Sequence, residues 1–338
     1  MLINGTRIFC IILGLWLLLL NALLFAARRN PADSPWLYFT SSRTGFNEIF
    51  RIRPDGTHIE KVTNFRFHVV GESLSPDGKK LLLSFDPGSE LEIFQFDPGT
   101  DTLEQLTTNN TRDYQARWSP DGKQIAFLSW RGDFPTLYLM ESDGTGRRRL
   151  PDTEDSNSPS WSPDGQWIVF SSYRESGGEI YKISPDGDNR QVISRNRLFQ
   201  DESPVWSPDG EWITFHSDRD GEPEIYKMRT NGTDIQRLTD SLYFDGFAQW
   251  SPDGEWIAFV TRRSGNQDIY RMRPDGSDVQ PVTQHPAEDS FPLWSPVLEF
   301  PFDTRSGAGG GALLFLVAGI IRIIRLRFPR LPRIKHRV

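Results

Sequence analysis

The chain has 338 residues and a net charge of −7 that is divided unevenly along its length. Residues 1–30 carry +3 and residues 301–338 carry +7, so the body between them carries −17. A body this acidic repels phosphate backbones, which argues against nucleic acid as a partner. The single cysteine, Cys10, excludes an internal disulfide and a thiolate metal site.

An apolar run stands near the start of the chain. Residues 8–27 are interrupted only by Asn21 and are long enough to cross a bilayer core. The run predicts a transmembrane helix within residues 1–30, either a retained signal anchor or a cleaved signal peptide. We favour the anchor, because Phe25 stands where a cut after Ala27 would need a small residue.

The middle of the chain is built from a repeat. The sequence Ser-Pro-Asp-Gly occurs five times at intervals of 43 to 45 residues, and the residue before it is Trp in four of the five copies. A period in the low forties with aromatic punctuation is typical of a four-stranded propeller blade. The copies begin at Ser75, Ser119, Ser162, Ser207 and Ser251, with a shortened sixth copy at Ser295.

Each unit repeats the same succession of strands and turns. Strands rich in β-branched and aromatic residues, such as residues 125–127 and then 137–138, follow each Ser-Pro-Asp-Gly turn. In the turn, Pro fixes φ at the first central position, Asp bonds to nearby backbone amides, and Gly takes the left-handed conformation. Local chemistry and long-range periodicity therefore predict the same fold.

The two ends of the repeat complete one another. Residues 36–39 match the strand that follows a turn but have no innermost strand before them. Residues 291–294 match an innermost strand with no blade after it. We therefore predict an all-β fold, a six-bladed β-propeller over residues 36–294, in which strand 291–294 pairs into the first blade. Such closure leaves no long sheet edge exposed.

A second apolar stretch, residues 307–321, precedes a basic tail. Within residues 301–338 we predict a Gly-rich linker, an apolar and basic helix, and a tail. The helix (residues 307–328) either spans the membrane or lies along its surface. Seven basic residues after the stretch favour a cytoplasmic tail, which would place the propeller outside the cytoplasm. Arg28 and Arg29 argue in the other direction.

The repeated W-S-P-D-G, I-A-F, R-x-G, E-I-Y and D-G-T pattern resembles the propeller of TolB, the periplasmic component of the bacterial Tol system, and related WD40-like propellers. The resemblance covers the propeller only, since the chain goes from the apolar run to the first blade without the α/β domain of TolB-type proteins. It implies a periplasmic protein-binding module that receives peptide segments of partners at the tunnel mouth.

Residues that recur in every blade are expected to build blades. The blade Trp residues are expected in the core, and the recurring Arg of R-x-G is expected to pair with the Glu or Asp near the next strand of the same blade. These Trp are Trp118, Trp161, Trp206, Trp250 and Trp294. The Arg are Arg43, Arg131, Arg174, Arg219 and Arg263, and the acids are Glu48, Glu92, Glu179, Glu224 and Asp268.

A series of aspartates stands five residues before the blade Trp. We expect their carboxylates to ring the mouth of the central tunnel, where they would draw in a cation or a basic peptide segment. The alternative is a repeated turn cap at the strand start. The members are Asp113, Asp201, Asp245 and Asp289, with Asp155 one position away.

The loops opposite the Ser-Pro-Asp-Gly turns vary in length and content, as binding loops do. Exposed aromatic side chains there would suit a partner surface, and a packed satellite cluster is the alternative. The candidates are Trp130, Phe134, Phe199, Tyr243 and Phe244.

Motifs for catalysis, metal or cofactor binding do not accompany the repeat. The five histidines form no H-x-H or H-E-x-x-H pattern, and no G-x-S-x-G occurs. We therefore expect a membrane-tethered, non-enzymatic propeller that binds a protein or peptide outside the cytoplasm, without a cofactor. One alternative is a ligand or metal sensor, or an enzyme, that uses the central tunnel through His216 or the acidic ring. Another is a purely structural spacer.

Overall fold

The computed structural model describes residues 35–88, 90–174, 177–196 and 198–296. The regular elements there are strands, β1 to β24, arranged in six four-stranded antiparallel sheets. The prediction of an all-β, six-bladed propeller is confirmed. Helices expected within residues 1–30 and 301–338 lie outside the described residues. Among the residues that are described, no helix has the length and apolar character needed to cross a bilayer.

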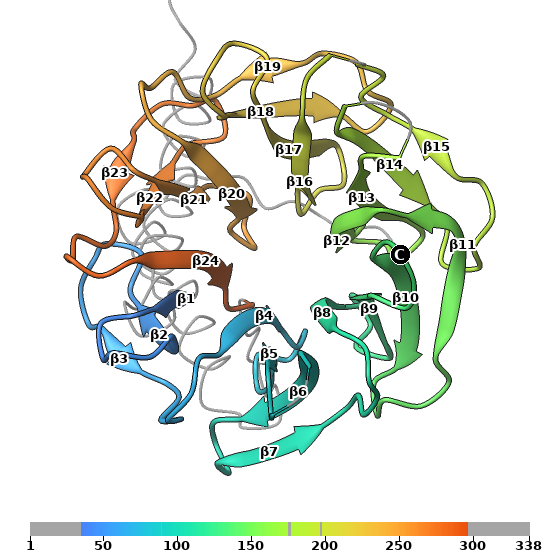
Figure 1. Cartoon of the computed structure of the whole chain (residues 1–338). Coiled ribbons are helices and arrows are strands. Elements are labelled where there is room, and N and C mark those ends of the chain that lie inside the picture. The colour runs from blue at the N-terminus through green and yellow to red at the C-terminus, as the bar shows by residue number, and fades with distance from the viewer. Residues whose placement is uncertain (1–34, 89, 175–176, 197, 297–338) are drawn as a thin grey trace, which may run out of the picture. The chain divides into compact units, whose positions relative to one another are not determined.

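The blades follow one another around the propeller axis in chain order, and each blade places its first strand innermost (Figure 1). Blade 2 comprises β4 (Val70–Leu74), β5 (Leu81–Phe85), β6 (Glu92–Asp97) and β7 (Thr102–Gln105). Blade 3 comprises β8 (Asp113–Trp118), β9 (Gln124–Ser129), β10 (Thr136–Glu141) and β11 (Arg148–Glu154). Blade 4 comprises β12 (Ser156–Trp161), β13 (Ile168–Ser172), β14 (Glu179–Ile183) and β15 (Gln191–Val192).

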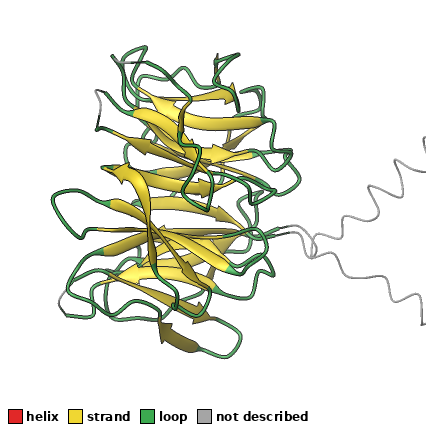
Figure 2. Cartoon of the chain, turned by 90° about the vertical axis from the view of Figure 1, so that its right-hand side faces the viewer, coloured by secondary structure: helices red, strands yellow, loops and turns green. Residues whose placement is uncertain are grey.

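Two further blades have the same order from the axis outward. Blade 5 comprises β16 (Asp201–Trp206), β17 (Trp212–Ser217), β18 (Glu224–Arg229) and β19 (Gln236–Arg237). Blade 6 comprises β20 (Asp245–Trp250), β21 (Ile257–Thr261), β22 (Asp268–Met272) and β23 (Gln280–Pro281). Seen from the side, these strands run between two layers of loops (Figure 2).

Blade 1 is assembled from both ends of the propeller. It comprises β24 (Asp289–Trp294), β1 (Leu37–Ser41), β2 (Glu48–Ile52) and β3 (Glu60–Lys61). Leu37 pairs with Trp294 and Ser41 pairs with Asp289. Beyond the ladder, the Trp36 amide donates to Ser295 Oγ and the Ser295 amide donates to the Trp36 carbonyl, both over 2.8 Å.

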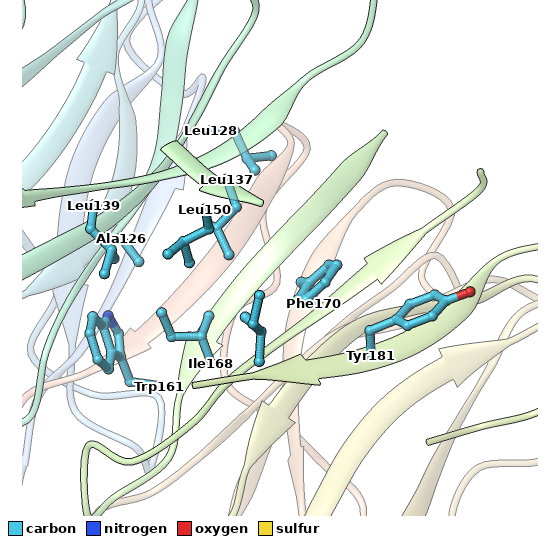
Figure 3. Close-up of a cluster of buried hydrophobic side chains, with 10 residues drawn as sticks. Ala126, Leu128, Leu137, Leu139, Leu150, Trp161, Ile168, Phe170 and Tyr181 are labelled. Atoms are coloured by element: carbon cyan, nitrogen blue, oxygen red, sulfur yellow. The ribbon is translucent and has the colours of Figure 1, made fainter. Parts of the chain in front are cut away.

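Hydrophobic clusters fill the spaces between neighbouring blades. The cluster between blades 3 and 4 joins Leu137 and Leu139 of one sheet to Ile168 and Phe170 of the next (Figure 3). Five similar clusters join the other neighbouring pairs around the ring. Because each sheet buries one face against the sheet before it and the other against the sheet after it, its two middle strands are mostly buried and rich in apolar residues.

The Ser-Pro-Asp-Gly turns adopt the expected geometry. In the first, Ser75 Oγ donates to Asp77 Oδ1 over 2.6 Å, the Lys80 amide donates to Ser75 Oγ over 2.9 Å, and Gly78 has a φ of 70°. Each later copy repeats these bonds. We call the side of the propeller that carries them the turn face and the opposite side, which carries the irregular loops, the variable face.

Candidate functional site

Four of the predicted site aspartates begin the innermost strands β8, β16, β20 and β24 at the variable face. All four side chains are fully buried, with 0% exposure. The structure therefore places these carboxylates inside the blades and corrects the expected ring of open charge at the tunnel mouth. They are Asp113, Asp201, Asp245 and Asp289.

The recurring Arg of the R-x-G loops is the partner of three of these aspartates. Arg219 donates through Nη2 to Asp201 over 2.8 Å and through Nε to Ser217 Oγ over 3.0 Å. Its guanidinium also lies 4.8 Å from the centre of the Tyr226 ring. The same arrangement joins Arg263 to Asp245 and Arg43 to Asp289.

This pairing corrects the expectation that the Arg residues bond to an acid on the third strand. The loop after the second strand turns the Arg side chain back toward the start of the innermost strand. The acids of the third strand bond elsewhere, as Glu224 does to Thr239 Oγ1 over 2.5 Å and to Arg237 over 3.0 Å. The result is a buried ion pair that fixes the innermost strand to the rest of its blade.

Two of the five aspartates depart from this scheme. Asp113 accepts from Ser129 Oγ over 2.5 Å and from Asn109 Nδ2 over 2.7 Å, and burial raises the pKa of its carboxyl. Asp155 lies between β11 and β12 with a φ of 57° and a partly exposed side chain. Burial raises the pKa of Asp155 as well. Of the five, only Asp155 has a carboxyl that is partly open to solvent.

Every innermost strand contains a bulge, seen as a shift in its register with the second strand. In five of the six, the residue three places before the end of the strand has a left-handed φ of 52–53°. Such a conformation costs a non-glycine residue roughly 1–3 kcal/mol and occurs preferentially at ligand sites. The five residues are Gln115, Ser158, Ser203, Phe247 and Phe291.

The bulges border a cavity of about 270 Å³ on the propeller axis, and all six innermost strands line it. We call the residues at its middle level the tunnel belt. Its members come one from each innermost strand, so the belt passes around the whole axis. They are Glu72, Gln115, Ser158, Ser203, Phe247 and Phe291.

One side of the tunnel belt is polar and internally bonded. The Gln115 amide donates to Glu72 Oε1 over 3.0 Å, and the Ser158 amide donates to Gln115 Oε1 over 2.6 Å. The hydroxyls of Ser158 and Ser203 lie 3.2 Å apart. A chain of hydrogen bonds therefore joins four consecutive blades at one level of the tunnel.

The other side of the tunnel belt is aromatic. The ring centres of Phe247 and Phe291 lie 5.4 Å apart, and Phe244 from the loop before β20 lies 5.8 Å from Phe247. His216 of β17 meets both Phe244 and Phe247 edge to face. A Cβ atom at Gly246 would lie 2.5 Å from Cζ of Phe244, so glycine there admits the ring.

The polar side chains of His216, Glu202 and Tyr173 lie next to the aromatic side of the tunnel belt. His216 Nε2 is 3.6 Å from Glu202 Oε2, and the interaction with the His216 ring holds the pKa of Glu202 below its ordinary value. Burial, together with the Glu202 carboxylate, raises the pKa of the Tyr173 hydroxyl. Nδ1 of His216 is buried and has no hydrogen-bond partner among the described residues.

The five predicted aromatic residues lie on three loops of the variable face: Trp130 and Phe134 on one, Phe199 on another, and Tyr243 and Phe244 on a third. Phe134 is 53% exposed, Tyr243 50% and Trp130 39%, while Phe199 and Phe244 are partly buried. Of these five, Phe244 alone has a ring contact with the tunnel belt within the described chain. Leu198 and Leu242, on the same loops as Phe199 and Tyr243, are the most exposed apolar residues there, at 85% and 87%.

Sequence reasoning missed the tunnel belt itself. Five of its members, all but Glu72, occupy one position of the repeat, three residues before the blade Trp, and the side chains there are Gln, Ser, Ser, Phe and Phe in chain order. The available signal was the variation between the recurring Asp and the recurring Trp of the innermost strand. The structure contains no group of three or more His, Cys, Asp or Glu side chains placed to hold a metal ion within residues 35–88, 90–174, 177–196 and 198–296.

These features define a six-bladed propeller with a bulge-lined central tunnel that opens toward a face of variable, partly apolar loops. The model of the TolB β-propeller domain matches residues 55–198 and 154–297. The chain belongs to this family.

The chain is also similar to individual TolB proteins. It is 33% identical to the Tol-Pal system protein TolB of Wolinella succinogenes over 109 residues, which are 32% of this chain and 26% of that protein. A solved structure assigned to TolB from Agrobacterium tumefaciens is 25% identical, with a TM-score of 0.63 over 77% of this chain and 90% of that one. TolB of Acinetobacter baumannii shares the fold, with 20% identity and a TM-score of 0.71 over 78% of this chain and 67% of that one. The chain matches about a quarter of the length of its Wolinella relative.

Proposed function

We propose that this protein is a non-enzymatic, extracytoplasmic, membrane-tethered propeller that binds a segment of a partner protein through its variable face and central tunnel. The observation that carries the proposal is the tunnel belt. Five residues in left-handed conformations share a repeat position, yet their side chains are of three kinds, Gln, Ser and Phe. A purely structural feature would use the same residue in each blade, as the turns do.

The variable face supports a protein as the partner. Leu198 and Leu242 are more than four-fifths exposed on neighbouring loops, and Tyr243 adds an exposed aromatic ring beside Leu242. Exposed apolar and aromatic residues around an open site are typical of protein interfaces. Relatives named as components of the Tol-Pal system make a protein partner the natural candidate.

The compartment and the tether rest on the chain outside the described residues. Residues 8–27 form an apolar run, and the tail after residue 321 is rich in arginine. Together they favour a propeller outside the cytoplasm with a cytoplasmic tail. Protease treatment of intact cells and of inverted vesicles tests this part. We expect the propeller to be cut only from outside and the tail only from inside, and the reverse pattern would overturn it.

Photo-crosslinking in living cells tests the binding role. A photoreactive amino acid at Tyr243 is expected to yield a discrete crosslinked protein, since that side chain points from the variable face. The matched control is Lys123, an exposed residue in a turn on the opposite face, where no such product is expected. Products from Lys123 alone, or from neither position, would refute binding through the variable face.

A further inference from the structure

Arg117 is the charged residue that the tunnel presents beyond the belt. It is the fifth residue of β8, the position directly before the blade Trp. The residues at this position in the other blades are uncharged, and the structure places four of them around the same cavity. They are Ser160, Val205, Gln249 and Leu293. Arg117 is therefore the one cationic side chain among the described residues that line the cavity. It lies nearer to the turn face than the tunnel belt does.

One side of the Arg117 guanidinium is already occupied. Nη1 donates to the backbone carbonyl of Glu72, to Glu72 Oε2 at 3.3 Å and to the Ala116 carbonyl at 3.1 Å. Glu72 Oε1 in turn accepts from Ser84 Oγ over 2.5 Å and from the Gln115 amide over 3.0 Å. These bonds hold the guanidinium in a fixed orientation and use both oxygens of the buried carboxylate.

The other side of the guanidinium is open. Among the described residues, no protein acceptor bonds to Nη2 or Nε of Arg117, and the side chain is 24% exposed. The Nε–H and Nη2–H groups form one edge of the planar fork, the edge that binds a carboxylate through two parallel hydrogen bonds. Lysine could not offer this geometry, because its ammonium group is a point charge without a planar edge.

Across the tunnel, β20 presents Gln249 at the level of Arg117, and the other lining side chains of β20 and β24 are apolar. Leu293 stands at the same level of β24 as Arg117 does of β8, and Phe247 and Phe291 stand at the belt level beside it. A ligand that fits this part of the tunnel would therefore direct an anionic group toward Arg117 and an apolar group toward Leu293 and the two phenylalanines. Between the two lie the hydroxyls of Ser158 and Ser203, which can bond to peptide amides.

We infer that the tunnel binds the C-terminal segment of a partner protein, with the terminal carboxylate on the open edge of Arg117 and an apolar last side chain against Phe247, Phe291 and Leu293. The inference rests on the proposed function and gives it a ligand. A chain that enters from the variable face passes the tunnel belt before it meets Arg117. The carboxylate must therefore enter the tunnel first. The C-terminus of a chain can enter in this way, whereas an internal loop has no terminal carboxylate.

The test compares two forms of one peptide pool. Fluorescent heptapeptides with randomised sequence and a fixed terminal phenylalanine are made as free acids and as C-terminal amides, and binding to the full-length protein is followed by fluorescence polarisation. We expect the acids to bind about tenfold or more tightly, because the carboxylate accepts charge-assisted hydrogen bonds that the amide cannot match. Equal binding of acid and amide, or no binding of either, would overturn the inference.

Variants locate the effect. In Arg117→Gln, the acids and amides should bind alike, and in Arg117→Lys the preference for the acid should shrink without vanishing. The matched control is Arg112→Gln, which removes the same charge from an exposed side chain just before the same strand and should keep the full preference.

Hydrocinnamic acid is expected to compete only weakly, and competition as strong as that of the acid peptides would point to a free small acid instead. A retained crosslink at Tyr243 with equal acid and amide binding would leave the proposed function standing and remove only this inference.

Discussion

Arg219 and Asp201 form a buried ion pair, with 2.8 Å between Nη2 and Oδ1, that fixes the start of β16 to the loop after β17. The carboxylate is fully buried and the arginine nearly so. Because the same pair recurs in blades 1 and 6, it is a device for holding innermost strands in place around the axis.

Asp201→Asn is expected to lower the free energy of unfolding by about 3 kcal/mol, since the variant leaves the Arg219 charge without its buried partner. Urea unfolding followed by tryptophan fluorescence measures the change. The control is Asp240→Asn, whose carboxylate is 89% exposed and should change stability by less than about 0.5 kcal/mol. A similar small loss for both variants would show that the buried pair contributes little.

We expect Asp113 to make the free energy of unfolding depend on pH with the opposite sign to that of a carboxylate whose pKa is lowered by folding. Burial raises its pKa, so the folded protein keeps this proton to a higher pH than the unfolded chain does. Ionisation then costs stability, and the cost is absent below about pH 3.9 and grows as pH rises through the folded pKa. Asp113→Asn removes the cost, so its gain in stability over the parent should be larger at pH 7 than at pH 4.

Asp143 provides the comparison for this pH series. Hydrogen bonds from Thr145 hold the pKa of Asp143 below its ordinary value, so its ionised form stabilises the fold above the unfolded pKa and that contribution is lost in acid. Asp143→Asn should therefore be less stable than the parent at pH 7 and closer to it at pH 4. An Asp113→Asn variant that follows this trend would contradict the assignment for Asp113.

The left-handed conformation at Ser203 predicts which residues that position accepts. Ser203→Val should lower the free energy of unfolding by about 2 kcal/mol, because a β-branched residue is strained at a φ of 52°. Ser203→Gly should remain within about 1 kcal/mol of the parent. Ser160→Val, at an extended position of the neighbouring strand, should be tolerated. Equal losses for both valine variants would argue that crowding, not backbone conformation, is responsible.

Gly246 controls the position of Phe244. Gly246→Ala places a methyl group 2.5 Å from Phe244 Cζ and 3.3 Å from His216 Nδ1, so the ring must move away from Phe247. We expect a loss of about 1 kcal/mol in stability and a several-fold loss of peptide affinity. In the Phe244→Ala background the stability loss from Gly246→Ala should fall below about 0.5 kcal/mol, as a double-mutant cycle would measure. An undiminished loss would mean that His216 alone resists the methyl group.

The propeller could be predicted from the sequence because its signals are local and periodic. Ser75, Asp77 and Gly78 each perform in the turn what their chemistry dictates, and the spacing of the turns sets the length of a blade. The apolar middle strands follow from burial on both faces. Turn chemistry, repeat spacing and strand burial all specify the same fold, which is the usual condition for a reliable prediction.

The site was harder to predict for two physical reasons. A carboxylate at the start of a strand can face solvent or turn inward. The sequence around Asp201 does not distinguish the two, because the choice depends on where a loop places Arg219. A bulge also leaves no compositional mark when Ser, Gln or Phe takes the left-handed conformation that glycine usually supplies. Of the predicted residues, Phe244 alone has a ring contact with the tunnel belt within the described chain.

The closure of blade 1 has a mechanical consequence. The ladder between β1 and β24 is antiparallel, and its pair nearest the outgoing chain is Leu37 with Trp294, followed at the far end by Ser41 with Asp289. A force that separates the chain before Trp36 from the chain after Ser295 would first break the two hydrogen bonds between those residues. It would then unzip the ladder one residue pair at a time, the loading direction in which a strand resists least, so the seam of the ring is also its point of release under tension.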